Sequence, residues 1–235
     1  METSSFSLME LFKLGGIIMW PLLAYSIAAV AIAIERIVYL TYHNMEIDDL
    51  AEKVSDFIKT NDFAGAAGYL SPLTKRRMGA RILLTMIQNV KTGKRFSERR
   101  VERAAEIEAA SCINSLENGF NFLVALGSLS PLTGFLGTVT GMIGAFRSIA
   151  EATEVNAQIV ANGIYEALIT TVFGLVIAII AMVAHSIFSH IVDKFASRVE
   201  GVCSDLTAQL AESRAENLEE SQIGAGIQDS QSDPE

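Results

Sequence analysis

A long charge-free run in the middle of the chain limits what the chain can fold into. From Asn118 to Phe146 the sequence contains no Asp, Glu, Lys or Arg, and about 20 apolar residues are enough for a helix to cross a bilayer. Two further uncharged runs are Leu14–Ile34 and Ala167–Val192. A membrane β-barrel would show short alternating segments instead. The sequence therefore predicts an all-α membrane protein with three transmembrane helices.

Small residues recur along the central run at alternating spacings of three and four. They are Gly127, Ser130, Gly134, Gly137, Gly141, Gly144 and Ser148. On a helix these positions form one continuous seam. In lipid, close association of helices depends on small residues that let backbones approach, and glycine otherwise lowers helix propensity. We interpret the seam as a helix-packing surface; the alternative is an ordinary span whose glycines the membrane tolerates.

A second seam of small residues runs along the third charge-free run. Its positions recur at spacings of four and three and are Ala167, Thr171, Gly174, Ala178, Ala181 and His185. A seam on each of two helices predicts either two neighbouring helices or one narrow lumen. The residues expected to mediate the closest packing are Gly134, Gly137, Gly141, Gly144 and Gly174.

Threonines and one glutamate beside these seams are candidates for an ion pathway. Thr138 borders the first seam, while Thr170 and Thr171 mark the second. The alternative for each threonine is a hydrogen bond to its own helix backbone. Glu166 stands at the outer mouth of the third run, one turn before Thr170. A carboxylate buried at that depth is costly and typical of an ion or proton path; the alternative is an interfacial carboxylate that faces water.

The distribution of charge predicts the orientation of the chain. Most Lys and Arg residues lie between the first and second runs, and the positive-inside rule places such a loop in the cytoplasm. Glu35 stands beside Arg36 at the cytoplasmic boundary of the first run, where its carboxylate can reach headgroup water. The predicted segments are an outer N-terminal segment 1–13, a first transmembrane helix 14–40, a cytoplasmic helical loop 41–117, a second transmembrane helix 118–147, an outer loop 148–163, a third transmembrane helix 164–192, a cytoplasmic helix 193–216 and a disordered acidic tail 217–235.

Apolar residues recur at helical spacing in the predicted cytoplasmic parts. One stripe is Ile47, Leu50, Val54 and Phe57, a second is Met78, Ile82, Met86 and Val90, and a third is Phe195, Val199, Val202, Leu206 and Leu210. We expect these helices to pack on one another. The stretch from Phe96 to Asn118 contains no Gly or Pro and is predicted to continue directly into the second transmembrane helix.

Composition argues against several other classes of protein. The net charge is −9, with acidic residues crowded after Val199, so we expect no nucleic-acid partner. Cys112 and Cys203 are isolated thiols without a nearby histidine pair, which predicts neither a metal site nor a disulfide framework. The sequence has no phosphate loop or nucleophile elbow, so it does not predict an enzyme.

Motifs in all three runs resemble one family. The first begins GGIIMWPLL and ends AIERI, the second reads SPLTGFLGTVTGMIGAF and the third reads GIYEALITTVFGL; together they resemble the MotA/TolQ/ExbB proton-channel family, most closely its three-span ExbB branch. The sequence departs from the family pattern at Ile180, where a proline is common, at Thr170, where a small residue is usual, and at Thr133, which replaces a usual apolar residue.

The resemblance implies a homopentamer around a central pore that holds two single-span helices of an ExbD- or TolR-like partner. It also implies that Thr138 and Thr171 line the pore, that Glu166 lies near its outer entrance, and that the proton-accepting aspartate is on the partner. Such a subunit sits in a bacterial inner membrane and drives a TonB- or TolA-like protein. No cofactor is expected beyond the transported ion.

Two questions stay open at this level. The first is whether the chain is an ion-conducting motor subunit or a non-conducting scaffold, which would need the seams but not Glu166 with its threonines. The second is the ion. Adjacent hydroxyls on Thr170 and Thr171 diverge on a helix but could flank a sodium ion with Thr138 as a third ligand, unless Thr170 bonds the carbonyl of Glu166. We expect protons, with sodium as the alternative.

Overall fold

The computed structural model describes residues 8–92, 97–151 and 157–230, which are helical apart from short turns and one isolated bridge between Asn44 and Arg77. The chain forms two compact units. Unit 1 comprises Met1–Val38 and Asn118–His190, and unit 2 comprises Tyr39–Glu117 and Ile191–Glu235. Each unit has its own packing.

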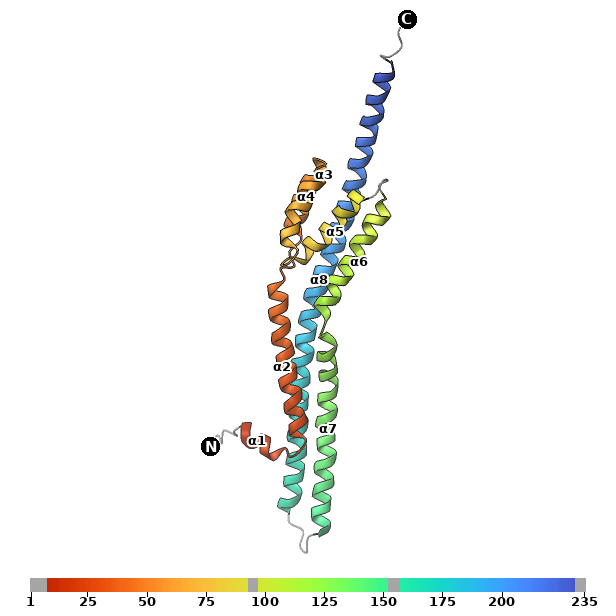
Figure 1. Ribbon diagram of the computed structural model, residues 1–235. Coiled ribbons are helices and arrows are strands. Elements are labelled where there is room, and N and C mark those ends of the chain that lie inside the picture. Colours follow the sequence, from red (N-terminus) through yellow and green to blue (C-terminus); the bar gives the residue numbers. More distant parts are fainter. Residues whose placement is uncertain (1–7, 93–96, 152–156, 231–235) are drawn as a thin grey trace, which may run out of the picture. The chain divides into compact units, whose positions relative to one another are not determined.

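Unit 1 is built on three helices that lie side by side in Figure 1. They are α2 (Met19–Tyr42), α7 (Phe120–Glu151) and the first part of α8 (Ala157–Ser230), and a short α1 (Leu8–Leu14) precedes them. Three helical stretches of the described chain are long and apolar enough to cross a membrane. The prediction of three transmembrane helices is therefore confirmed.

Helices α2 and α8 meet at a cluster of large apolar side chains. Its buried members are Met19, Leu22, Ile169 and Ile177, against which Phe12, Ile18, Tyr25 and Phe173 pack. Other large side chains of unit 1 point outward, and Leu132 and Phe135 are each 64% exposed. An apolar outer surface of this kind suits lipid or a neighbouring subunit.

Unit 2 contains the remaining helices and the end of α8. They are α3 (Asp48–Lys59), α4 (Phe63–Leu70), a 3₁₀ turn (Ser71–Leu73), α5 (Met78–Thr92) and α6 (Glu98–Glu117). The Asp62 side chain accepts a 2.8 Å hydrogen bond from the Gly65 amide and so caps α4. Of the three predicted stripes, all members are buried except Phe57 and Val202, which are half-buried.

The helix bounds differ from the predicted ones in four places. Gly15 and Gly16 interrupt the first run, so α2 begins at Met19. Gly119 adopts φ +91° between α6 and α7, so the cytoplasmic helix does not continue directly into the second transmembrane helix. The predicted outer loop is shorter, because α7 ends at Glu151 and α8 begins at Ala157; residues 152–156 lie outside the described residues.

The fourth difference concerns α8. The predicted third transmembrane helix, cytoplasmic helix and first part of the disordered tail form one helix of 74 residues that ends at Ser230. The sequence contains no proline between Pro131 and Pro234, so no proline within α8 forces the helix to stop earlier. The last five predicted tail residues, 231–235, lie outside the described residues.

Candidate functional site

The backbones of α7 and α8 touch where glycines face each other. A Cβ atom on Gly134 would lie 2.8 Å from the Thr170 carbonyl oxygen and 3.1 Å from the Thr171 Cα atom. In the opposite direction, a Cβ atom on Gly174 would lie 2.5 Å from the Ser130 carbonyl oxygen. These neighbours are backbone atoms that cannot rotate aside. The two helices can therefore approach this closely only because both positions are glycine.

The two predicted seams pack against each other within one chain, which replaces the expectation of two separate neighbours or a lumen. Gly127 faces Met182, and Gly141 faces Gly163 and Ala167. Each seam therefore has the other as its partner on this face.

The outer end of the first seam differs from the prediction. Outside its own helix, no atom of the described residues lies within 4 Å of the Cβ position of Gly144, and the residue is exposed. Ala145 is buried in its place and lies against Gly163. A helix has 3.6 residues per turn, so a seam of alternating three and four drifts slowly around it. By Ala145 the face toward α8 has moved on by one residue.

Thr170 and Thr171 converge on the same carbonyl. The Thr171 hydroxyl donates to the Gly134 carbonyl oxygen at 3.2 Å. The Thr170 hydroxyl lies 2.8 Å from the Ala167 carbonyl oxygen and 3.3 Å from that of Gly134. Thr170 does not bond the Glu166 carbonyl among the described contacts, and its side chain reaches α7 just as that of Thr171 does. Adjacent hydroxyls thus meet at one acceptor, although they leave the helix in different directions.

These two threonines differ in exposure. Thr170 is 1% exposed, and a Cβ atom on Gly137 would overlap its hydroxyl. Thr171 is half-buried. A hydroxyl without a partner in an apolar contact would be costly, and both are satisfied by backbone carbonyls. The arrangement ties α8 to α7 and keeps one hydroxyl, that of Thr171, within reach from outside the contact.

Thr138 is placed apart from this cluster. It is half-buried, and its hydroxyl donates to the Phe135 carbonyl oxygen of its own helix at 2.7 Å. Thr140 behaves in the same way, with 3.0 Å to the Leu136 carbonyl oxygen. Both follow the backbone-bonding alternative for threonines in membrane helices. The structure therefore joins Thr170, Thr171 and Gly134, and leaves Thr138 on another part of α7.

Glu166 contacts the segment that precedes α2. The side chain is half-buried, and a Cβ atom on Gly16 would overlap its Oε1 atom and lie 3.1 Å from its Cδ atom. Gly16 has φ +65°, a conformation that favours glycine. The carboxylate therefore rests directly on the backbone of the turn between α1 and α2. No local pattern in the sequence indicates this contact, because the two residues lie in separate segments of unit 1, far apart along the chain.

A buried arginine marks the other end of the three helices. Arg36 is 6% exposed, donates to Glu35 at 2.6 Å and 2.8 Å, and lies 3.5 Å from the Cβ position of Gly119. His185, which ends the second seam, stands edge-on to Phe120 with ring centroids 5.9 Å apart. The Glu35–Arg36 pair was expected at this boundary, but the burial of the guanidinium against the Gly119 break was not.

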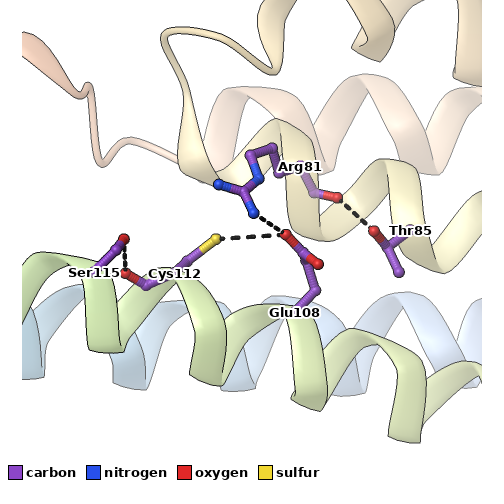
Figure 2. A network of polar contacts seen from close by, with 5 residues as sticks. All are labelled: Arg81, Thr85, Glu108, Cys112 and Ser115. Atoms are coloured by element: carbon purple, nitrogen blue, oxygen red, sulfur yellow. Dashed lines mark hydrogen bonds and ion pairs between the residues drawn. The ribbon is translucent and has the colours of Figure 1, made fainter.

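Unit 2 carries a polar network of a different kind, shown in Figure 2. Arg81 on α5 forms an ion pair with Glu108 on α6 at 2.5 Å, and the Cys112 sulfur lies 4.0 Å from the same carboxylate. Thr85 and Ser115 bond carbonyls of their own helices. The network fastens α5 to α6. Cys112 and Cys203 are both free thiols.

Comparisons with known proteins point in one direction. The profile of the MotA/TolQ/ExbB proton channel family matches residues 74–201. The putative biopolymer transport protein ExbB-like 3 of Synechocystis sp. is 32% identical over 177 residues, which cover 74% of this chain and 81% of that protein. The biopolymer transport protein ExbB of Pseudomonas putida is 35% identical over 122 residues, 52% of this chain and 36% of that protein.

A third relative comes from another branch. The Tol-Pal system protein TolQ of Haemophilus influenzae is 43% identical over 84 residues, 36% of this chain and 37% of that protein. The chain thus spans about a third of these ExbB and TolQ proteins and about four fifths of the Synechocystis protein. The family profile includes Thr138, Glu166, Thr170 and Thr171, whereas the turn at Gly16 lies outside it.

Proposed function

The chain belongs to the MotA/TolQ/ExbB proton channel family, and on that premise we propose that it is the channel subunit of an inner-membrane motor. Five copies surround a central pore that holds an ExbD- or TolR-like dimer. The proton gradient drives movement between the two components, and a TonB- or TolA-like protein passes the work to the periplasm or outer membrane. The subunit works as an ion path and not as an enzyme.

The observation that supports this proposal is the contact between α7 and α8. Gly134 brings the two backbones together, and its carbonyl accepts a hydrogen bond from the Thr171 hydroxyl. The Thr170 hydroxyl lies 3.3 Å from the same carbonyl and 2.8 Å from the Ala167 carbonyl of its own helix. Glu166 adds a half-buried carboxylate on the same helix. Membrane helices can pack on glycines alone. The hydroxyl pair and the carboxylate are therefore extra polar groups in apolar surroundings, which are costly and typical of ion or proton paths.

Protons fit this arrangement better than sodium. Sodium needs several oxygen ligands at once, but Thr170 is 1% exposed and Thr138 bonds its own helix away from the pair. Thr171 and Glu166 are the half-buried groups that remain on α8. A proton needs only a carboxylate and a path. The sodium-driven motor stays as the alternative, because Thr171 could still supply one ligand to a site shared with the partner.

The orientation is part of the proposal. Unit 2 contains most of the basic residues of the chain, which places it in the cytoplasm by the positive-inside rule. The N-terminus and the connection between α7 and α8 then lie outside, and the C-terminus lies inside.

Thiol labelling of single-cysteine variants, made in a background without Cys112 and Cys203, tests this orientation. Ser4→Cys and Thr153→Cys, which change positions outside the described residues, should react with a membrane-impermeant reagent from outside. Ser97→Cys, in the connection between α5 and α6, should react only after the membrane is opened. Labelling of the Ser97→Cys variant from outside would reverse the orientation.

The central experiment is ion uptake by the reconstituted complex. The chain is co-purified with its partner, placed in liposomes, and given a proton gradient alone or a sodium gradient alone. Glu166→Gln and Thr171→Val keep the side-chain shapes. Thr140→Val is the matched control, since Thr140 is exposed and bonds only its own helix. Both test variants should co-purify with the partner and lose at least about tenfold in proton uptake, as when a proton-transfer group is removed.

The three possible results separate the candidate functions. Proton uptake that fails in both test variants and survives in Thr140→Val supports the proposal. Uptake under the sodium gradient alone would favour the sodium-driven motor. Normal uptake in both Glu166→Gln and Thr171→Val would favour the non-conducting scaffold.

A further inference from the structure

The turn between α1 and α2 crosses one face of α8 at two neighbouring points. A Cβ atom on Gly15 would lie 3.4 Å from Ile169 Cγ2, and one on Gly16 would overlap Glu166 Oε1. Glu166 and Ile169 are three positions apart, so they share a face of the helix. The turn therefore lies along that face and covers one side of the Glu166 carboxylate.

Packing on both sides fixes the position of this turn. Phe12 of α1 stands edge-on to Trp20 of α2, with ring centroids 5.5 Å apart. Phe12 and Ile18 also pack against the apolar cluster shared by α2 and α8. The Gly16 carbonyl accepts a 3.3 Å hydrogen bond from the Met19 amide. Apolar contacts and the start of α2 thus determine where the backbone of the turn lies, independently of Glu166.

We propose that Gly16 is a positioning residue for Glu166: the turn at Gly15–Gly16 shields the carboxylate on one side and sets the place from which it handles the ion. The consequence for transport rests on the proposed function above, whereas the placement rests on the contact alone. Because Gly16 has no side chain, the Glu166 carboxylate occupies the space that a Cβ atom at position 16 would fill. The outer entrance of the ion path then includes a segment that precedes the first transmembrane helix.

The geometry predicts which group moves when residue 16 is given a side chain. The atom that a Cβ on residue 16 would meet is the end of a flexible side chain, which can rotate away at low cost. The backbone turn is held by its packing and stays. A side chain at position 16 therefore displaces the carboxylate from the turn and exposes it, while the helices remain assembled.

A water-soluble carbodiimide with an added amine measures this exposure, because it modifies carboxyl groups that water reaches. The full-length chain is labelled in its complex with the partner, and the modified peptide that contains residue 166 is quantified by mass spectrometry over time. Glu166→Gln identifies the signal. Gly16→Ala and Gly16→Asn should raise the initial labelling rate severalfold. Asparagine tolerates positive φ better than alanine, so it separates displacement of the carboxylate from backbone strain.

The matched control is Ile17→Ala, which changes the next residue of the same turn but removes a side chain that is 81% exposed. Its labelling rate should equal that of the wild type. A wild-type rate in Gly16→Asn, in a complex that still contains the partner, would overturn the proposal. A raised rate in both Gly16 variants but not in Ile17→Ala supports it.

Ion uptake by the same variants distinguishes this proposal from the proposed function. If labelling rises and uptake falls, both are supported. If labelling rises and uptake stays normal, Gly16 still positions Glu166, but the role of Glu166 in ion handling is wrong. If labelling does not change, the positioning role fails whatever the uptake is.

Discussion

The contact between α7 and α8 in unit 1 and the core of unit 2 are packed by opposite rules. In unit 1 the smallest residue, glycine, lies at the helix contact, as at Gly134, and large residues such as Leu132 and Phe135 are each 64% exposed. In unit 2 the large residues are inside, and Ile82 and Leu210 are each 0% exposed. The same chain therefore uses close backbone contact between α7 and α8, and burial of large side chains in unit 2 as well as between α2 and α8.

The difference follows from what surrounds each unit. In water, burying apolar surface stabilises a fold in proportion to the area removed from solvent. In lipid there is no such gain, and helices associate through close van der Waals contact and hydrogen bonds. Helix α8 follows both rules along its length. Its contact face carries Gly174 and Ala178 in unit 1, and Phe195, Val199 and Leu206 in unit 2.

Charged side chains differ between the two units, whereas hydroxyls do not. Hydroxyls bond carbonyls of their own helix in both, as Ser130 does in unit 1 and Thr85 does in unit 2. In unit 2 charged side chains also link separate segments, as Arg77, directly before α5, does with Asp49 of α3 at 2.7 Å. Surface ion pairs of this kind contribute little each. Most of the stabilisation of unit 2 therefore comes from the buried apolar stripes and not from these ion pairs.

The largest effect is expected from the core of unit 2. Leu210→Ala removes a large side chain that is 0% exposed, and such changes cost about 2–5 kcal/mol. The loss in the free energy of unfolding is measured by unfolding the full-length protein in detergent with heat or denaturant. The matched change in unit 1 is Leu132→Ala, where the side chain is 64% exposed and the loss should be much smaller. Equal losses would contradict the difference in packing between the units.

A smaller effect is expected at the contact between α7 and α8. Gly134→Ala adds one methyl group that meets backbone atoms of Thr170 and Thr171, and overpacking costs about 1–3 kcal/mol. Gly144→Ala is the control on the same helix, since no described residue of another helix has an atom within 4 Å of its Cβ position; alanine there should be neutral or slightly stabilising. If both variants unfold at the same temperature, the glycines do not define the contact.

The sequence predicted the parts of the fold that follow from local pattern. Charge-free runs indicated the transmembrane helices, and apolar spacing indicated the buried stripes, because both depend only on neighbouring residues. Contacts between residues that are distant in the sequence could not be predicted from these local patterns. A seam of small residues predicts close packing but not its partner, since the same spacing suits a helix of the same chain or of another subunit. The change from Gly144 to Ala145 at the end of the contact has a different cause, because a seam of alternating three and four drifts around a helix of 3.6 residues per turn.

The candidate site was predictable to a similar extent. Residue type singled out Thr170 and Thr171 within the charge-free run and Glu166 at its outer end, because polar and charged groups at such depths are unusual. The meeting of both hydroxyls at Gly134 needs the exact distance between two helices, which no pattern in either helix contains. The approach of Gly16 to Glu166 likewise depends on where the first turn lies on α8. The paired glycines Gly15 and Gly16 were the one signal in the sequence that the chain turns there.

The smallest effect concerns the ion pair between Asp49 and Arg77 and its dependence on pH. The hydrogen bond from the Arg77 guanidinium lowers the pKa of the Asp49 carboxyl below its ordinary value. A carboxyl whose pKa is lower in the folded state stabilises the fold above its unfolded pKa, and the contribution is lost as the pH falls through the folded pKa. Asp49 is half-exposed, so the contribution at neutral pH is at most about 1 kcal/mol.

Asp49→Asn tests this sign. At neutral pH the variant should unfold at a slightly lower temperature than the wild type, and the difference should shrink as the pH falls below about 4, the ordinary value for aspartate. Asp205→Asn is the control, because Asp205 is exposed and forms no ion pair within the described residues; it should show no such convergence. A difference for Asp49→Asn that grows in acid would mean that the protonated carboxyl, and not the carboxylate, is the form that stabilises unit 2.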